Sequence, residues 1–99
     1  MILKHMLNIR EDLIEADCSK VIETLMWELY YEVAPRVQSG DTFVLFRTEN
    51  DLSNFCHNNN LDIRALKWVI NSMREEGLVA SETIPIILTS FGIEKLCIN

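Results

Sequence analysis

The side chains best suited to bind another molecule lie between positions 62 and 76, where basic and amide groups recur at helical spacing. Arg64, Lys67, Asn71 and Arg74 follow one another at intervals of three, four and three residues, which places them on one stripe of an α-helix. Arg and Lys reach guanine edges or phosphates in the major groove of B-DNA, and Asn can bind adenine through two hydrogen bonds. The stripe is therefore a candidate DNA-reading surface, although an ordinary solvated helix face would show the same pattern.

The other residues of this predicted helix indicate how the stripe would be held. Asp62 is suited to cap the first turn, and Gly77 is suited to end the helix in the left-handed conformation. Trp68 falls nearly opposite the apolar side, so either it marks a contact surface for a partner or another segment covers it. The apolar side itself predicts a face packed in a core, made of Ile63, Leu66, Val69, Ile70 and Met73.

The cysteines and histidines do not follow the pattern of a metal or catalytic site. Cys56 and His57 are adjacent, which is not metal-ligand spacing, and the three cysteines include no C-x-x-C. The three glycines stand apart at positions 40, 77 and 92 and form no phosphate-binding loop. We therefore expect no metal, no cofactor and no enzymatic activity, with free thiols in a reducing compartment.

The length and charge of the chain limit what it can do. Its 99 residues fit one domain, and an apolar content of 48% argues against a disordered chain. The net charge of −6 has the wrong sign for attracting phosphate in bulk. Residues 1 to 7 are interrupted by Lys4 and His5, unlike a secretory signal, and no apolar run approaches the ~20 residues that span a bilayer. We expect a cytoplasmic protein that does not bind membranes.

Two helices are predicted within residues 1 to 40. Residues 2 to 15 form an amphipathic pattern whose apolar side includes Leu3, Met6 and Leu7. Residues 19 to 33 predict a longer helix, which Pro35 ends or kinks. Trp27 and Tyr31 lie away from its main apolar stripe, so this helix has a second apolar face. That face would pack on the N-terminal helix or on a second copy of the chain.

Residues 41 to 99 predict a compact alternation of strands and helices. A strand over 42–46 precedes a helix over 51–57, which Thr48 and Asp51 are placed to cap reciprocally. An asparagine turn over 58–60 leads to the helix over 62–76. Two short strands, 78–79 and 86–89, form a hairpin, and Thr89 is placed to cap a last helix over 91–96.

The order and spacing of these pieces resemble the winged helix-turn-helix domain of small regulators of the MarR and PadR families. The matching segments are LDI..L at 61–66, MREEGLV at 73–79 and ILTSFG at 87–92. The resemblance implies a mainly α fold with a small β-wing: a three-helix core, a short strand and a β-hairpin over 41–99, with 1–40 as a helical extension. It implies that the helix over 62–76 enters the major groove, with a DNA-contacting set of Arg47, Arg64, Lys67, Asn71 and Arg74.

The family also implies dimers formed through helices outside the wing. The residues suited to contact a second copy or another partner are Leu3, Met6, Leu7, Trp27, Tyr31 and Trp68. Against direct DNA binding, the wing spans only 80–84 and holds Glu82 but no basic residue. Four basic residues face five acids between Arg47 and Glu76. Two hypotheses therefore stand: a homodimeric DNA-binding transcription regulator, or an acidic protein-interaction module on the same scaffold that does not bind DNA directly.

Overall fold

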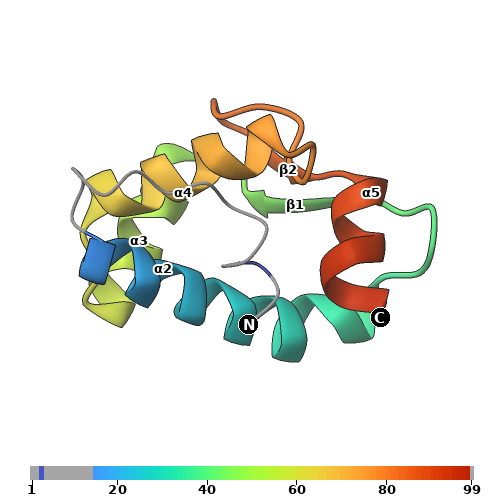
Figure 1. Cartoon of the computed structure of the whole chain (residues 1–99), viewed down its shortest axis with the longest axis horizontal. Helices are drawn as coiled ribbons and strands as arrows, with labels where there is room; N and C mark the ends of the chain where they lie inside the picture. Colours follow the sequence, from blue (N-terminus) through green and yellow to red (C-terminus); the bar gives the residue numbers. More distant parts are fainter. Residues whose placement is uncertain (1–2, 4–14, 99) are drawn as a thin grey trace.

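The computed structural model describes residue 3 and residues 15–98, and it is mainly helical with one small sheet (Figure 1). The helical elements in chain order are α2 (Glu15–Glu28), η1 (Leu29–Val33), η2 (Ala34–Arg36), α3 (Glu49–Asn59), α4 (Ile63–Glu75), α5 (Ser90–Ile93) and η3 (Glu94–Ile98). The strands are β1 (Phe43–Phe46) and β2 (Ile86–Leu88). Of the helix predicted over 2–15, only Leu3 and Glu15 lie within the described residues.

The first long helical segment is α2 with its continuation in η1 and η2. Its described part starts at Glu15, ahead of the predicted Ser19. The wider π-type turn η1 leads into the single 3-10 turn η2, which contains Pro35. Proline lacks the backbone N–H that an α-helix needs, so the predicted end of the helix at this residue is confirmed.

The next two helices and their turn follow the sequence prediction closely. Thr48 Oγ1 accepts from the Asp51 backbone N–H while the Asp51 carboxylate accepts from the Thr48 N–H, which is a capping box. Asn60, at φ 55°, takes the left-handed conformation that ends α3. The Asp62 carboxylate accepts from the Arg64 N–H at 2.8 Å and caps α4. Gly77, at φ 77°, follows the end of α4 as predicted.

The sheet differs in detail from the predicted hairpin. Strand β1 pairs antiparallel with β2, with Phe43 opposite Leu88 and Val44 opposite Ile87. The predicted strand at 78–79 is reduced to one bridge, Val79 to Leu88. Thr89 caps α5 as predicted, accepting from the Gly92 N–H at 2.9 Å. At Gly92 an added Cβ would collide with the Leu78 carbonyl, so a residue without a side chain is required there.

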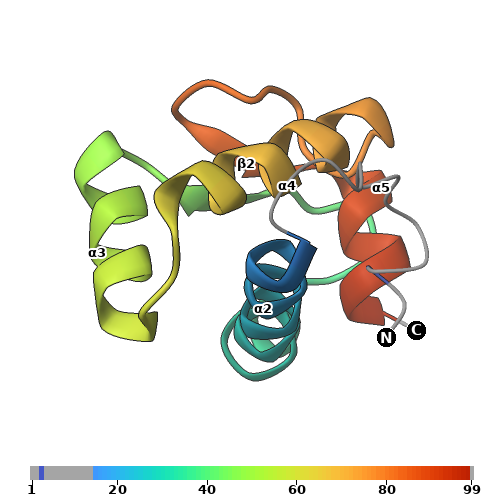
Figure 2. The ribbon, with the colours of Figure 1, turned by 60° about the vertical axis from the view of Figure 1, so that its left-hand side comes forward.

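The core lies where α2 crosses beneath α4, with α3 on one side and α5 with η3 on the other (Figure 2). The predicted apolar face of α4 is confirmed, since Leu66, Val69, Ile70 and Met73 are buried and Ile63 packs against them. From α2 and η1 come Ile22, Leu25, Leu29 and Val33. Within residues 3 and 15–98, no helix is both long and apolar enough to cross a bilayer.

Candidate interaction surfaces

The basic stripe of α4 lies on the outside of the molecule, but its cations contact carboxylates of the same chain. The Arg64 guanidinium binds the Asp62 carboxylate at 3.0 Å, although 75% of the Arg64 side chain is exposed. The Lys67 ammonium lies 3.8 Å from the Glu49 carboxylate of α3, with 57% of its side chain exposed. Hydrogen bonds from Arg64 are the main cause of a lowered pKa for Asp62.

The C-terminal end of the stripe forms a connected network. Arg74 pairs with Glu82, from the loop between Val79 and β2, and donates to Asn71 Oδ1 at 3.0 Å. The Asn71 amide in turn donates to the Glu75 carboxylate at 3.2 Å. Part of the hydrogen-bonding capacity of Asn71 and Arg74 is therefore used within the chain. Arg47, the fifth predicted DNA contact, is exposed and makes no ion pair within the described part of the chain.

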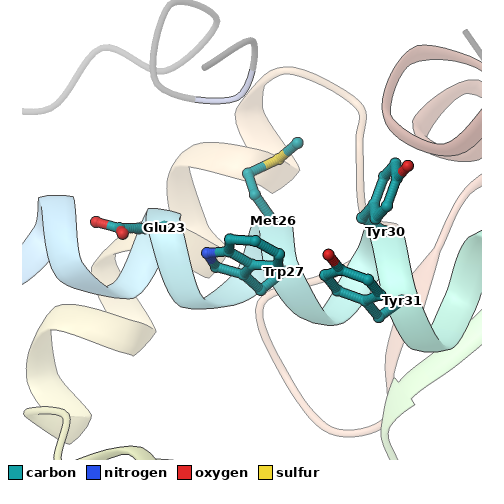
Figure 3. Close-up of a pocket in the computed structure, with 5 residues that line it drawn as sticks. All are labelled: Glu23, Met26, Trp27, Tyr30 and Tyr31. Atoms are coloured by element: carbon teal, nitrogen blue, oxygen red, sulfur yellow. The ribbon is translucent and has the colours of Figure 1, made fainter.

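A second surface is aromatic and lies on the outer side of α2 and η1 (Figure 3). Trp27, Tyr30 and Tyr31 are 56%, 67% and 57% exposed. The rings of Trp27 and Tyr31 stack in parallel at 4.9 Å, and Tyr30 meets Tyr31 edge to face at the same centroid distance. With Glu23 and Met26 these rings line a hollow of about 550 Å³. We call these five residues the aromatic surface.

The helical repeat places these rings on the side of the helix opposite the core positions. Ile22 and Leu25 of α2 and Leu29 of η1 are buried in the core, which turns residues 23, 27, 30 and 31 toward solvent. The predicted placement of Trp27 and Tyr31 away from the main apolar stripe is confirmed, while the packing of this second face on another segment or copy stays a prediction. Tyr30 and Glu23 were missed, although both lie one helical turn from Trp27 and that spacing could have found them.

Of the remaining predicted interface residues, the two that the structure describes, Leu3 and Trp68, do not belong to this surface. Trp68 is 39% exposed and lines a separate, smaller hollow of about 200 Å³ with Lys67 and Asn71. Leu3 is fully buried in the core, so its assignment to an exposed interface is corrected to a core role. Met6 and Leu7 lie outside the described residues.

The three cysteines are free thiols, two of them buried. Burial is the largest cause of a raised pKa at Cys18, Cys56 and Cys97, which disfavours the reactive thiolate. Among the residues that the structure describes, no group of three His, Cys, Asp or Glu side chains converges as a metal site would require.

Comparisons of the chain with models of protein families, with curated proteins and with solved structures find no match.

Proposed function

We propose that the protein is a protein-interaction module on a winged-helix scaffold, and that its aromatic surface docks a basic segment of another protein. The scaffold is supported by the succession β1, α3, asparagine turn, α4, β2 and by the bridge from Val79 to Leu88. In that arrangement α3 and α4 would be the helix-turn-helix pair, and the loop over 80–85 would be a shortened wing.

The observation that carries this proposal is the exposure of three neighbouring aromatic rings. Each exposes more than half of its surface. Covering roughly 100 Å² of one ring would contribute about 2.5 kcal/mol of binding free energy for that ring, at about 25 cal/mol per Å². An exposed ion pair contributes at most about 1 kcal/mol. The aromatic surface is therefore a stronger source of binding free energy than the ion pairs of the α4 stripe.

The chemistry of the aromatic surface indicates a basic partner. Glu23 lies one helical turn before Trp27, with its carboxylate extending away from the indole (Figure 3), and it makes no hydrogen bond or ion pair with any described residue. An arginine guanidinium can stack on the indole face and bind a carboxylate at the same time. The net charge of −6 would also favour the approach of a positively charged segment.

A titration with peptides of defined charge tests the proposal. We expect a fluorescein-labelled oligo-arginine peptide to bind more tightly than oligo-lysine, because arginine stacks on aromatic rings. We expect the citrulline counterpart, which is neutral, to bind weakest. The variant Trp27→Ala with Tyr31→Ala should weaken arginine-peptide binding about tenfold or more, since each cation–π contact contributes about 0.5–2 kcal/mol.

Trp68→Ala is the matched control, because it removes an exposed tryptophan from a different surface. It should leave the affinity for the arginine peptide unchanged in fluorescence anisotropy. Equal binding by the double variant and the wild type would contradict the proposal.

The second candidate is a homodimeric DNA-binding regulator, in which two α4 helices would enter major grooves one helical turn apart. The exposure of Arg64 and Lys67 favours it, because their present ion pairs are weak enough for phosphate to replace. Against it, a phosphate placed at the stripe would also approach the carboxylates of Asp62, Glu49, Glu75 and Glu82.

Duplex binding measured across a range of salt concentrations tests this candidate. If α4 contacts phosphates, log K should fall by about 0.9 per neutralised phosphate for each decade of salt. Arg64→Ala with Lys67→Ala should then make that slope shallower by about two contacts per subunit. Absence of duplex binding at low salt, or a slope that the double variant leaves unchanged, would reject the candidate.

A further inference from the structure

A third surface feature is a cleft of about 240 Å³ between the helical segment that ends in η2 and the strand β1. All four residues of β1 line this cleft, although neighbouring side chains of a strand point to opposite faces of the sheet. The strand therefore turns its edge toward the cleft, and in the described sheet it pairs with β2 alone. The helical residues that line the cleft are Leu25, Glu28, Glu32, Val33 and Arg36.

The walls of this cleft combine apolar surface with three exposed charged side chains, the acids Glu28 and Glu32 and the basic Arg36. Leu25, Val33 and Phe46 are buried core residues whose surfaces reach the cleft. Glu32 has a basic partner, because its carboxylate lies 3.7 Å from the Arg36 guanidinium. Glu28 makes no hydrogen bond or ion pair with any residue that the structure describes, although it lines the same cleft.

The electrostatics of Glu28 follow from this position. Burial is the largest cause of a raised pKa for its carboxyl group, and the nearby Glu32 carboxylate raises that pKa further. The Arg36 guanidinium lowers it only in part. The ionised form of Glu28 is therefore disfavoured, and an ammonium ion in the cleft would offset both the lost hydration of its carboxylate and the repulsion from Glu32.

We propose that this cleft binds a small organic ammonium ion, with the charged nitrogen at Glu28 and the apolar part against Leu25 and Val33. The volume decides the size of the ligand. Drug-sized ligands occupy pockets of about 300–1,000 Å³, and a non-hydrogen atom in a liquid takes up to about 30 Å³. The cleft thus suits roughly eight to ten non-hydrogen atoms, which excludes a nucleotide or a folded peptide. This site is separate from the aromatic surface and does not depend on partner binding.

Titration of the full chain with 2-phenylethylamine, followed by NMR and calorimetry, tests the proposal. We expect a Kd of about 1 mM or lower. The alcohol 2-phenylethanol has nearly the same shape but no charge, and it should bind at least about tenfold more weakly because burying Glu28 beside a neutral group brings no ionic attraction. Affinity for the amine should rise with pH as the Glu28 carboxyl group loses its proton, because its ionised form attracts the ammonium and its protonated form does not. The other charged groups that face Glu28 are Glu32 and Arg36.

Two variants locate the binding. Glu28→Gln should weaken amine binding about tenfold or more, and far-ultraviolet circular dichroism should show that it folds like the wild type. Glu23→Gln removes the same charge from the aromatic surface of the same helix and should leave amine binding unchanged. The proposal is overturned if the alcohol binds as well as the amine, if Glu28→Gln binds the amine like the wild type, or if no binding occurs up to about 10 mM.

Discussion

The outward side chains of α4 and α2 differ in whether they have binding partners within the same chain. On α4, each cation of the stripe contacts a carboxylate of the chain, and Asn71 bonds to two neighbours. On α2 and η1 the aromatic rings contact one another and stay more than half exposed. A charged face can be neutralised by residues of its own chain, whereas an exposed apolar face loses contact with water only when something covers it. This difference leads us to look for a partner at α2 before α4.

The largest expected difference is in stability, between the buried and the exposed side of the helical segment formed by α2 and η1. Leu29→Ala removes a fully buried side chain, and we expect it to lower the free energy of unfolding by about 2–5 kcal/mol. Trp27→Ala removes an exposed ring that stacks on Tyr31, so its cost should stay within about 1 kcal/mol. Urea unfolding of both variants measures the difference. A cost for Trp27→Ala as large as that for Leu29→Ala would show that the ring supports the fold.

A smaller effect tests whether the ion pairs of α4 belong to the folded chain. The pKa of Asp62 is lowered in the folded protein from its ordinary value of 3.8, chiefly by hydrogen bonds from Arg64. A group with a lowered folded pKa stabilises the fold above its unfolded pKa, and that contribution is lost as pH falls through the folded pKa. Asp62→Asn keeps a good N-cap but removes the titration.

Wild type should therefore be more stable than Asp62→Asn at about pH 7, and the gap should shrink as pH falls below about 4, toward the folded pKa. The urea midpoint of each protein at several pH values measures this. Because Asp62→Asn retains the cap, the comparison isolates the charge. A gap that stays constant with pH would contradict a carboxylate–guanidinium pair in the folded protein.

Sequence patterns predicted the local features well, because those features depend on near neighbours. The capping box at Thr48, the cap at Asp62 and the left-handed Gly77 each rest on residues within one helical turn. The apolar face of α4 follows from its period alone. The outward position of Trp27 and Tyr31 was equally visible as a second face of one helix.

Features that depend on distant residues could not be predicted in this way. The contact of Lys67 with Glu49 and that of Arg74 with Glu82 require knowing how α3 and the 80–85 loop lie against α4. The pairing of β1 with β2 joins strands that are separated in the sequence by α3 and α4. The predicted hairpin of 78–79 with 86–89 is reduced to the single bridge between Val79 and Leu88. The cleft beside Glu28 likewise exists only once β1 is placed against the helical segment.

The most direct test of the central claim uses the two tryptophans as separate reporters. Each indole N–H gives its own signal in an amide proton–nitrogen NMR spectrum, and single Trp→Phe variants assign them. During titration with the oligo-arginine peptide, we expect the Trp27 signal to move with the same apparent Kd as the anisotropy measurement while the Trp68 signal stays in place. Movement of the Trp68 signal with a stationary Trp27 signal would contradict it.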